Sequence, residues 1–401
     1  MEIKEKIKLA PYTTFKIGGE AKYFGVVKDI EDLKEGVNFA KQNSLPVFIL
    51  GGGSNLLISD NGFDGLVLKI ENKDLVVGVL SDDLVEVVVG AGMLLDDLAY
   101  KMAKKNLWGL ESLSWIPGTV GAGVVQNCGA FGVEMKDVVD WVEVFDMENG
   151  EMKRLLNKEC EFGYRNSVFK KEPNWVVVRV ALRLRILDDE TLDRFACARE
   201  DEKQSFSPTD FSKKNPSQFI GRLSSEDERG EASSVTIAPQ SSLRGVERSG
   251  TTKQSRKANL GYKGLEDLKN KKDLKVKDVR KKIIEIRGKN YPLSEGLGSA
   301  GCFFKNPIIS KNEFEKLKEK FPETPFFEDG ENIKIPIAWF IDQFEWKGFF
   351  EGEVGVYNKH ALMLVNKGEG TCEEVKKLAQ KIEKDVFEKT GLRLEREVVF
   401  V

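Results

Sequence analysis

Two glycine-rich stretches constrain the fold of this chain more than any other feature. The first, "GGGSN", follows directly on the apolar run "LPVFIL" at residues 45–50, and the second, "PGTVGAGVVQNCGAFG", carries no charge over residues 117–132. Glycine lets the main chain approach a ligand closely. Linkers are rich in serine and polar residues, so the second stretch is not a linker. Both stretches indicate loops that hold a flat or phosphorylated ligand; a tight turn or close backbone packing are the structural alternatives.

The elements around these stretches alternate between strands and helices. The sequence predicts strands at 21–27, 45–50, 141–147 and 175–187, and helices at 29–43, 94–106 and 276–290. Asp29 is the expected N-cap of the first helix. A helix after Thr371 has a capping box with Glu374 and should end at Gly391, before a last strand at 392–401. With 401 residues the chain should contain at least two domains.

The composition changes abruptly in residues 191–257. This segment is rich in serine, lysine, arginine and glutamate and has neither a helical nor a strand period. Such a sequence buries too little apolar surface to offset the entropy of ordering. We predict a low-complexity insertion that is mobile, with a small ordered subdomain around "FIGRL" as the alternative.

Composition excludes several classes of function. The net charge of -3 leaves no basic surface for nucleic acid, and no apolar run reaches the ~20 residues of a membrane helix. The N-terminus lacks the pattern of a secretory signal, so we expect a cytoplasmic protein. With one histidine and five widely spaced cysteines, neither a metal site nor a disulfide framework is expected. Those residues are His360, Cys128, Cys160, Cys197, Cys302 and Cys372.

Several residues could carry chemistry. Ser54 and Asn55 add hydrogen-bond donors to the first glycine loop, and Arg165 in "FGYRNS" could grip a carboxylate with two parallel hydrogen bonds. Alternation in "LEREV" places Glu395 and Glu397 on one strand face. The alternatives without a chemical role are a surface arginine and glutamates exposed to solvent. Cys302, in "GSAGCFFKNP", is either a packed small hydrophobe or a reactive thiol.

Seven motifs in this order resemble one family, the UDP-N-acetylenolpyruvoylglucosamine reductases, also called UDP-N-acetylmuramate dehydrogenases. They are "YTTFKIGG", "ILGGGSNLLISD", "IPGTVGAGVVQNCGAFGVE", "FGYRNSVFK", "GSAGCFFKNP", "AWFIDQFEWKG" and "LEREV". The resemblance covers residues 11–190 and 258–401. It implies an α+β fold: FAD-binding subdomains at 1–72, joined by strand 391–401, and at 73–190, with a substrate-binding domain at 258–401.

The resemblance also implies the reaction. NADPH would reduce FAD and leave, and UDP-N-acetylglucosamine enolpyruvate would then enter and be reduced to UDP-N-acetylmuramate, a precursor of peptidoglycan. We expect a monomer whose partners are this nucleotide sugar and NADPH, with no nucleic acid and no membrane. One alternative is another FAD-linked oxidase or dehydrogenase; the other is a catalytically disabled relative that binds flavin or a nucleotide sugar.

Residue roles follow from the same resemblance. Arg165 would hold the substrate carboxylate, Glu397 would act as its protonated partner, and Cys302 stands where the family pattern has a proton-donating serine. A thiol, with an ordinary pKa of ~8.5, yields a proton more readily than an alcohol. The implied FAD contacts are Gly51, Gly52, Gly53, Ser54, Asn55, Pro117, Gly118, Thr119, Gly121, Asn127 and Gly129. The implied substrate contacts are Tyr164, Tyr262, Lys305, Asn306 and Gln343.

Overall fold

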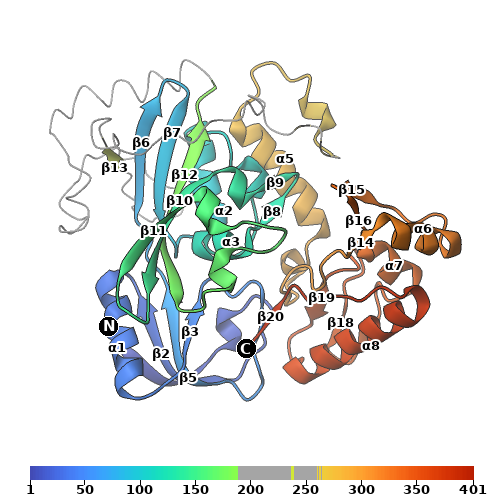
Figure 1. Ribbon diagram of the computed structural model, residues 1–401, viewed down its shortest axis with the longest axis horizontal. Helices are drawn as coiled ribbons and strands as arrows, with labels where there is room; N and C mark the ends of the chain where they lie inside the picture. The colour runs from blue at the N-terminus through green and yellow to red at the C-terminus, as the bar shows by residue number, and fades with distance from the viewer. Residues whose placement is uncertain (188–235, 239–259, 261, 263) are drawn as a thin grey trace. The chain divides into compact units, whose positions relative to one another are not determined.

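The computed structural model describes residues 1–187, 236–238, 260, 262 and 264–401 (Figure 1). The predicted insertion at 191–257 lies outside the described residues, except for the strand Thr236–Ala238. The chain forms two compact units, each described here by itself. Unit 1 comprises Met1–Val26, Glu35–Lys69 and Arg287–Val401, and unit 2 comprises Val27–Lys34 and Ile70–Ile286.

The N-terminal part of unit 1 is a four-stranded sheet in the order β1-β2-β5-β3. β1 (Ile3–Lys8) pairs antiparallel with β2 (Glu20–Val27), and β3 (Val47–Leu50) pairs parallel with β5 (Phe63–Ile70). The predicted helix at 29–43 is confirmed as α1 (Ile30–Gln42), and Asp29 accepts hydrogen bonds from the amides of Glu31 and Asp32. These are the bonds by which an N-cap carboxylate satisfies the first turn of a helix.

The C-terminal part of unit 1 consists of small sheets and three helices. One sheet joins β14 (Ile308–Ser310), β16 (Asn332–Lys334) and β15 (Phe327–Asp329), and another joins β17 (Phe350–Glu351), β18 (Val354–Val356) and β19 (Leu364–Asn366). The helices are α6 (Lys311–Lys320), α7 (Ile337–Gln343) and α8 (Cys372–Thr390). They enclose a core around Phe303, Phe304 and Phe340.

Helix α8 follows its sequence prediction. The side chains of Thr371 and Glu374 form both bonds of the capping box, and Gly391 ends the helix in the left-handed conformation. The predicted last strand is shorter than expected: β20 (Val399–Phe400) pairs parallel to the two-residue strand β4 (Leu56–Leu57), and Arg396 forms a single bridge with Phe304.

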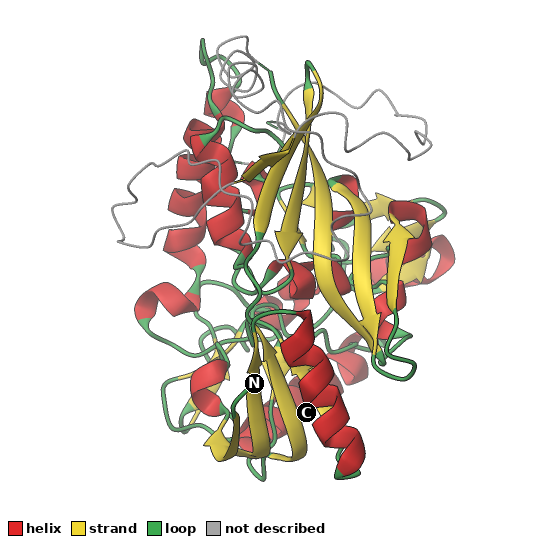
Figure 2. Ribbon diagram, turned by 90° about the vertical axis from the view of Figure 1, so that its left-hand side faces the viewer, coloured by secondary structure: helices red, strands yellow, loops and turns green. Residues whose placement is uncertain are grey.

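Unit 2 is built on a sheet in the order β11-β10-β12-β7-β6-β13 (Figure 1). Its long strands, yellow in Figure 2, lie side by side. Their bounds are β6 (Leu75–Ser81), β7 (Leu84–Gly90), β10 (Val139–Asp146), β11 (Met152–Leu156), β12 (Trp175–Arg185) and β13 (Thr236–Ala238). β13 pairs parallel with β6, so a short piece of the predicted insertion extends this sheet.

The second glycine-rich stretch of unit 2 forms α3 (Val120–Gln126) and β8 (Gly129–Ala130) and is followed by β9 (Val133–Glu134). Unit 2 also contains α2 (Leu95–Lys104), and α5 (Val276–Asn290) begins in unit 2 and ends in unit 1. Single 3₁₀ turns occur at Ala10–Tyr12, Glu111–Leu113, Met135–Asp137, Asn157–Cys160, Val168–Lys170, Glu266–Leu268 and Pro292–Glu295. None of the helices in the described ranges is long and apolar enough to cross a membrane.

The two units each combine segments that lie far apart in the sequence. The segments at 1–26 and 35–69 share one unit with 287–401, and 264–286 groups with the sheet of unit 2, while the predicted domain boundaries stay a prediction. A physical reason is visible in unit 1: Thr14 Oγ1 donates to the carbonyl of Ser299 (2.7 Å), and Asn366 Nδ2 donates to the carbonyl of Phe15 (3.1 Å). These contacts join segments that lie far apart in the sequence.

Candidate active site

The segment around Cys302 is held in unit 1 by main-chain pairing with β19. Gly298 and Asn366 exchange two hydrogen bonds of 2.8 Å, and the amide of Phe303 donates to the carbonyl of Leu362 (2.8 Å). Cys302 pairs with Met363 in a single antiparallel bridge. The backbone of "GSAGCFF" is therefore fixed along one edge by a strand of the small sheet.

The other edge of this segment pairs with the "LEREV" motif. The amide of Glu397 donates to the carbonyl of Phe303 (2.8 Å), and the amide of Lys305 donates to the carbonyl of Glu395 (2.8 Å). Two of the seven motifs therefore lie side by side, and Glu397 is paired with the residue next to Cys302. The side chains of both Cys302 and Glu397 are half-buried.

A tight turn sets the backbone just before Cys302. Gly301 has a positive φ of 78°, and its amide donates to Ser299 Oγ (3.2 Å). Ser299 is fully buried, and its hydroxyl donates to the carbonyl of Leu364 (2.9 Å). A side chain at position 301 would be strained at this φ, because only glycine adopts it readily.

The first glycine loop contacts the same motif. Asn55 Nδ2 donates to the carbonyl of Glu397 (3.1 Å), and the amide of Val399 donates to the carbonyl of Asn55 (3.0 Å). Gly53 has a φ of 62°, and a Cβ there would lie 2.0 Å from the carbonyl oxygen of Tyr12. Gly53 is thus required by packing against the chain itself. Gly51, Gly52 and Ser54 are half-buried.

The predicted substrate contacts of unit 1 have partners of their own. Lys305 forms a close ion pair with Glu395, and Asn306 Oδ1 accepts the amide of Ile337 (3.1 Å) at the start of α7. Gln343 is exposed at the end of α7. Asn306 therefore caps a helix, while Gln343 is open to solvent.

In unit 2 the second glycine stretch forms the loop before α3, the helix itself and the turn after it. Thr119 is the N-cap of α3 and accepts the amide of Ala122 (3.4 Å). A Cβ on Gly121 would lie 2.7 Å from Ala91 Cβ, and one on Gly129 would lie 2.7 Å from Glu134 Cγ. Close backbone packing therefore explains these two glycines. Pro117 is half-buried and Gly118, with a φ of 111°, is buried.

Asn127 is completely buried at the C-terminus of α3, in the left-handed conformation. Its Nδ2 donates to the carbonyl of Gly163 (2.9 Å) and to Glu134 Oε2 (3.2 Å), and its Oδ1 accepts the amide of Lys136 (3.0 Å). The structure thus shows Asn127 joining three segments of unit 2. That it also contacts FAD stays a prediction.

Arg165 lies in a tight turn anchored by this asparagine. Gly163 and Asn166 exchange two main-chain bonds (2.9 and 3.2 Å), and Arg165 between them has a φ of 52°. Non-glycine residues rarely adopt this conformation, and it is concentrated at functional sites. The Arg165 guanidinium lies 3.9 Å from Glu134 Oε1 and 5.3 Å from the ring centre of Tyr164.

Tyr262 belongs to unit 2 as well. Its side chain is 47% exposed, and its ring packs edge-on against Phe131, with 5.2 Å between ring centres. Phe131 lies in the second glycine stretch, so one predicted substrate contact touches the loop that holds the predicted FAD contacts.

Comparison with known proteins identifies the family. The model of an FAD binding domain family matches residues 21–156, and that of the UDP-N-acetylenolpyruvoylglucosamine reductase C-terminal domain matches residues 291–401. The curated UDP-N-acetylenolpyruvoylglucosamine reductase of Pseudomonas aeruginosa is 33% identical over 400 residues, covering 99% of this chain and 98% of the relative. The chain belongs to the UDP-N-acetylenolpyruvoylglucosamine reductase family.

Other relatives agree with this assignment. The reductase of Flavobacterium johnsoniae is 33% identical over 405 residues, covering 99% of each chain. The crystal structure of UDP-N-acetylenolpyruvylglucosamine reductase from Thermus caldophilus matches with a TM-score of 0.59 and 23% identity, covering 100% of this chain and 99% of that one. The predicted α+β, FAD-linked reductase fold is confirmed, and the protein is an FAD-dependent oxidoreductase.

Sequence reasoning missed several residues of this reductase's candidate site. Glu134 contacts both Asn127 and Arg165, and Ser299 shapes the turn before Cys302. Glu134 ends the motif "CGAFGVE", which was noted only for its glycines. Ser299 lies inside a quoted motif, but its buried hydroxyl could not be foreseen without the fold.

The surroundings of His360, Cys160 and Cys372 fit structural roles. His360 Nδ1 accepts the amide of Leu362 (3.3 Å), and burial lowers the pKa of this imidazole. Cys160 is buried, which raises the pKa of its thiol to about 12, and Cys372 is buried at the start of α8. Among the residues that the structure describes, no group of three or more His, Cys, Asp or Glu could hold a metal ion.

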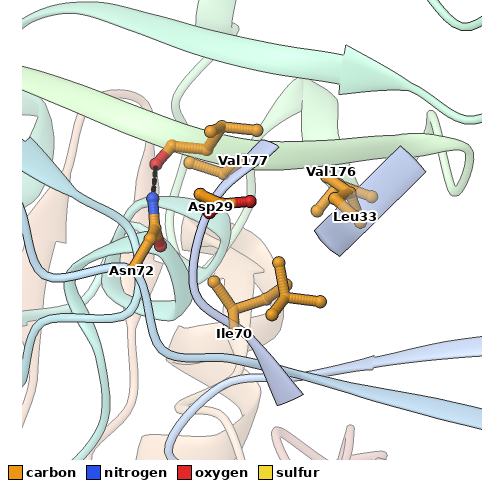
Figure 3. Close-up of a pocket in the computed structure, with 8 residues that line it drawn as sticks. Asp29, Leu33, Ile70, Asn72, Val176 and Val177 are labelled. Atoms are coloured by element: carbon orange, nitrogen blue, oxygen red, sulfur yellow. Dashed lines mark hydrogen bonds between the residues drawn. The ribbon is translucent and has the colours of Figure 1, made fainter. Parts of the chain in front are cut away.

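A small apolar pocket in unit 2 is separate from these residues (Figure 3). Its lining comes from two segments of unit 2 near Val27 and Ile70 and from β12, and Asn72 Nδ2 donates to the carbonyl of Val178 (2.7 Å) at its edge. None of the predicted site residues lines it. The pocket therefore carries no part of the candidate site.

Proposed function

We propose that this chain is an FAD-dependent enzyme that reduces UDP-N-acetylglucosamine enolpyruvate to UDP-N-acetylmuramate with NADPH. The observation that carries the proposal is the pairing of "GCFFKNP" with "LEREV" in unit 1, with Asn55 of the first glycine loop bonded to Glu397. Three motifs distant in sequence meet there around Cys302 and Glu397, in a chain 33% identical over its length to curated reductases.

The donors of the two glycine loops fit a flavin nucleotide. Gly51–Asn55 provide main-chain amides with a hydroxyl and a carboxamide, and the loop before α3 adds the hydroxyl of Thr119. Such groups suit phosphate oxygens, which accept hydrogen bonds only. FAD, when bound, would carry hydride from NADPH to the β-carbon of the enolpyruvyl group.

The roles of the protein side chains follow from the charge that this addition creates. Hydride arriving at the β-carbon leaves negative charge on the α-carbon and the carboxylate, which fixed donors stabilise. Arg165, held in its turn, would bind the carboxylate, and Glu397 would act as a protonated partner. Cys302 would give its proton to the α-carbon: the S–H bond breaks, the C–H bond forms, and the thiolate remains.

The proposal also covers the residues that contact the substrate, the location of the enzyme and its oligomeric state. Tyr164 and Tyr262 in unit 2 and Lys305, Asn306 and Gln343 in unit 1 would contact the nucleotide sugar. Lys305 already pairs with Glu395, so the Glu395 carboxylate would partly offset the positive charge that Lys305 presents to the sugar. We further propose that the enzyme is a cytoplasmic monomer that supplies peptidoglycan synthesis.

An anaerobic experiment tests this function. NADPH should bleach the flavin of the purified protein, and UDP-N-acetylglucosamine enolpyruvate should restore its absorbance within the turnover time. UDP-N-acetylglucosamine, which lacks the enolpyruvyl group, serves as the matched control and should leave the flavin reduced. If the enolpyruvyl substrate also fails to reoxidise the flavin, the proposed function is wrong.

A further inference from the structure

A buried tyrosine lies against the turn that precedes Cys302 in unit 1. The side chain of Tyr291 is 7% exposed, and its hydroxyl oxygen lies 4.0 Å from the position that a Cβ would take on Gly301. Gly301 immediately precedes Cys302, so the phenol meets the turn that presents the thiol. Neither composition nor motif spacing singles out this tyrosine.

The position of Tyr291 is set by its own backbone and by a cation. Its carbonyl accepts the hydroxyl of Ser294 (2.6 Å) and the amide of the same residue (3.2 Å), at the start of the turn Pro292–Glu295. The guanidinium carbon of Arg287, on α5, lies 5.5 Å from the centre of the ring. The backbone of Tyr291 is therefore fixed by the turn, and its ring packs against the Arg287 guanidinium.

The electrostatics of this pair favour a neutral phenol. Burial raises the pKa of Tyr291 to about 12, with the charge of Arg287 opposing and that of ionised Cys302 reinforcing the shift. A phenol with this pKa keeps its proton next to a thiolate, whose ordinary pKa is ~8.5. A phenol that keeps its proton would act toward a nearby thiolate as a hydrogen-bond donor and not as a source of the proton.

We infer that Tyr291 is a positioning residue whose phenol stabilises the Cys302 thiolate. The inference rests on the proposed role of Cys302 as the proton donor. When the S–H bond breaks, its electron pair stays on sulfur, and the phenol O–H remains intact and faces that charge. The proton that resets the thiol comes from water, since the phenol retains its own.

Tyr291→Phe tests the inference without any substrate. The rate at which iodoacetamide alkylates Cys302 is followed against pH, by mass spectrometry of the peptide that contains it. Loss of a hydrogen bond to a charged sulfur should move the midpoint upward by about one pH unit. Arg287 on α5 packs against the Tyr291 ring, and Glu397 pairs with Phe303 next to Cys302, so both residues are left intact.

Tyr357→Phe is the matched control. Tyr357 is also a buried tyrosine of unit 1, but its hydroxyl donates to Glu295 (2.9 Å) and not to the turn at Cys302. This variant should alkylate like the wild type. Flavin content and the thermal midpoint of each variant show whether it has folded.

Kinetics of the half-reactions separate this inference from the proposed function. In Tyr291→Phe, reduction of the flavin by NADPH should be unchanged, while reoxidation by the enolpyruvyl substrate should slow by roughly tenfold. If the wild type itself is not reoxidised, the proposed function fails. If the wild type is reoxidised and Tyr291→Phe matches it in both alkylation and reoxidation, Tyr291 is only a packing residue and the inference is overturned.

Discussion

At the scale of single residues, the first prediction concerns Cys302, the proposed proton donor. It occupies the position where the family pattern has serine, at the end of a turn that Ser299 and Gly301 hold in place. Cys302→Ala should leave flavin reduction unchanged and slow substrate reduction by about 10²–10⁴-fold, the usual contribution of a general acid. Stopped-flow absorbance of the two half-reactions measures both rates separately.

Cys302→Ser is the matched variant for this prediction. It should keep much of the activity and lose sensitivity to thiol reagents, because an alcohol is not alkylated under these conditions. Full turnover by the alanine variant would mean that the thiol is a packed small hydrophobe.

Asn127 carries a second prediction at this scale. All the polar atoms of its buried side chain bind the protein, so Asn127→Ala leaves buried donors and acceptors without partners. We expect a loss of about 2–3 kcal/mol in the free energy of unfolding, measured in urea. Gly163 and Glu134 should also shift, loosening the turn of Arg165. Asn127→Asp, which has the same size, keeps the acceptor for Lys136 but turns a buried carboxylate oxygen toward Glu134 and the Gly163 carbonyl, so it should lose at least as much; equal stability of all three proteins would contradict the prediction.

Residue roles could be predicted only where a motif points to them. Arg165, Cys302 and Glu397 stand in recognisable motifs, and their assignment as catalytic residues stays a prediction. Tyr291 and Glu134 could not be found in this way, since their contacts arise from turns that fold back on distant segments. The glycines add a structural reason of their own: Gly53 and Gly121 pack too closely against the chain for a side chain, and their contact with FAD stays a prediction.

At the scale of elements, α8 is joined to the strand segment that carries Glu397. Arg396 forms two hydrogen bonds to Glu383 on α8 (2.5 and 2.8 Å), and both side chains are one quarter exposed. Arg396 precedes Glu397, so this ion pair fixes the backbone of the predicted catalytic residue against a helix.

A double-mutant cycle tests the ion pair between α8 and this segment. Glu383→Gln and Arg396→Gln, alone and together, should give a coupling energy of about 1 kcal/mol in urea unfolding, after allowing for solvent screening of a partly exposed pair. Each single variant should also slow substrate reduction more than flavin reduction. Lys377 and Glu373, an exposed pair on the same helix 3.9 Å apart, supply the control cycle, in which the coupling should be near zero. Equal coupling energies in the two cycles would show that the pair of Arg396 and Glu383 does not fix the segment that carries Glu397.

Elements whose own residues carry a cap or an apolar period could be predicted. Strands whose bounds depend on a pairing partner far away in the sequence could not. The helices α1 and α8 follow their caps and apolar periods closely. The last strand does not, because its residues divide between two partners: Arg396 bridges to Phe304, and only Val399–Phe400 pair with the two residues of β4. The pairing of β13 with β6 was equally invisible, since three residues in a polar segment carry no period.

At the scale of the whole molecule, the chain offers two glycine-rich loops but no second nucleotide-binding motif in its sequence. Gly51–Asn55 belong to unit 1 and Pro117–Gly129 to unit 2, and both loops lie in the region matched by the FAD binding domain family. We propose that NADPH and the enolpyruvyl substrate use the same place in turn, as the family resemblance implies.

Steady-state kinetics test whether one place serves both substrates. If NADPH must leave before the nucleotide sugar enters, the two substrates never occupy the enzyme together, and double-reciprocal plots should be parallel. Excess enolpyruvyl substrate should also inhibit competitively against NADPH, because it binds the oxidised enzyme where NADPH must bind. UDP-N-acetylglucosamine should show the same competition without being reduced. Intersecting lines would require a complex that holds both substrates at once, and the chain would then need a nicotinamide site that its motifs do not reveal.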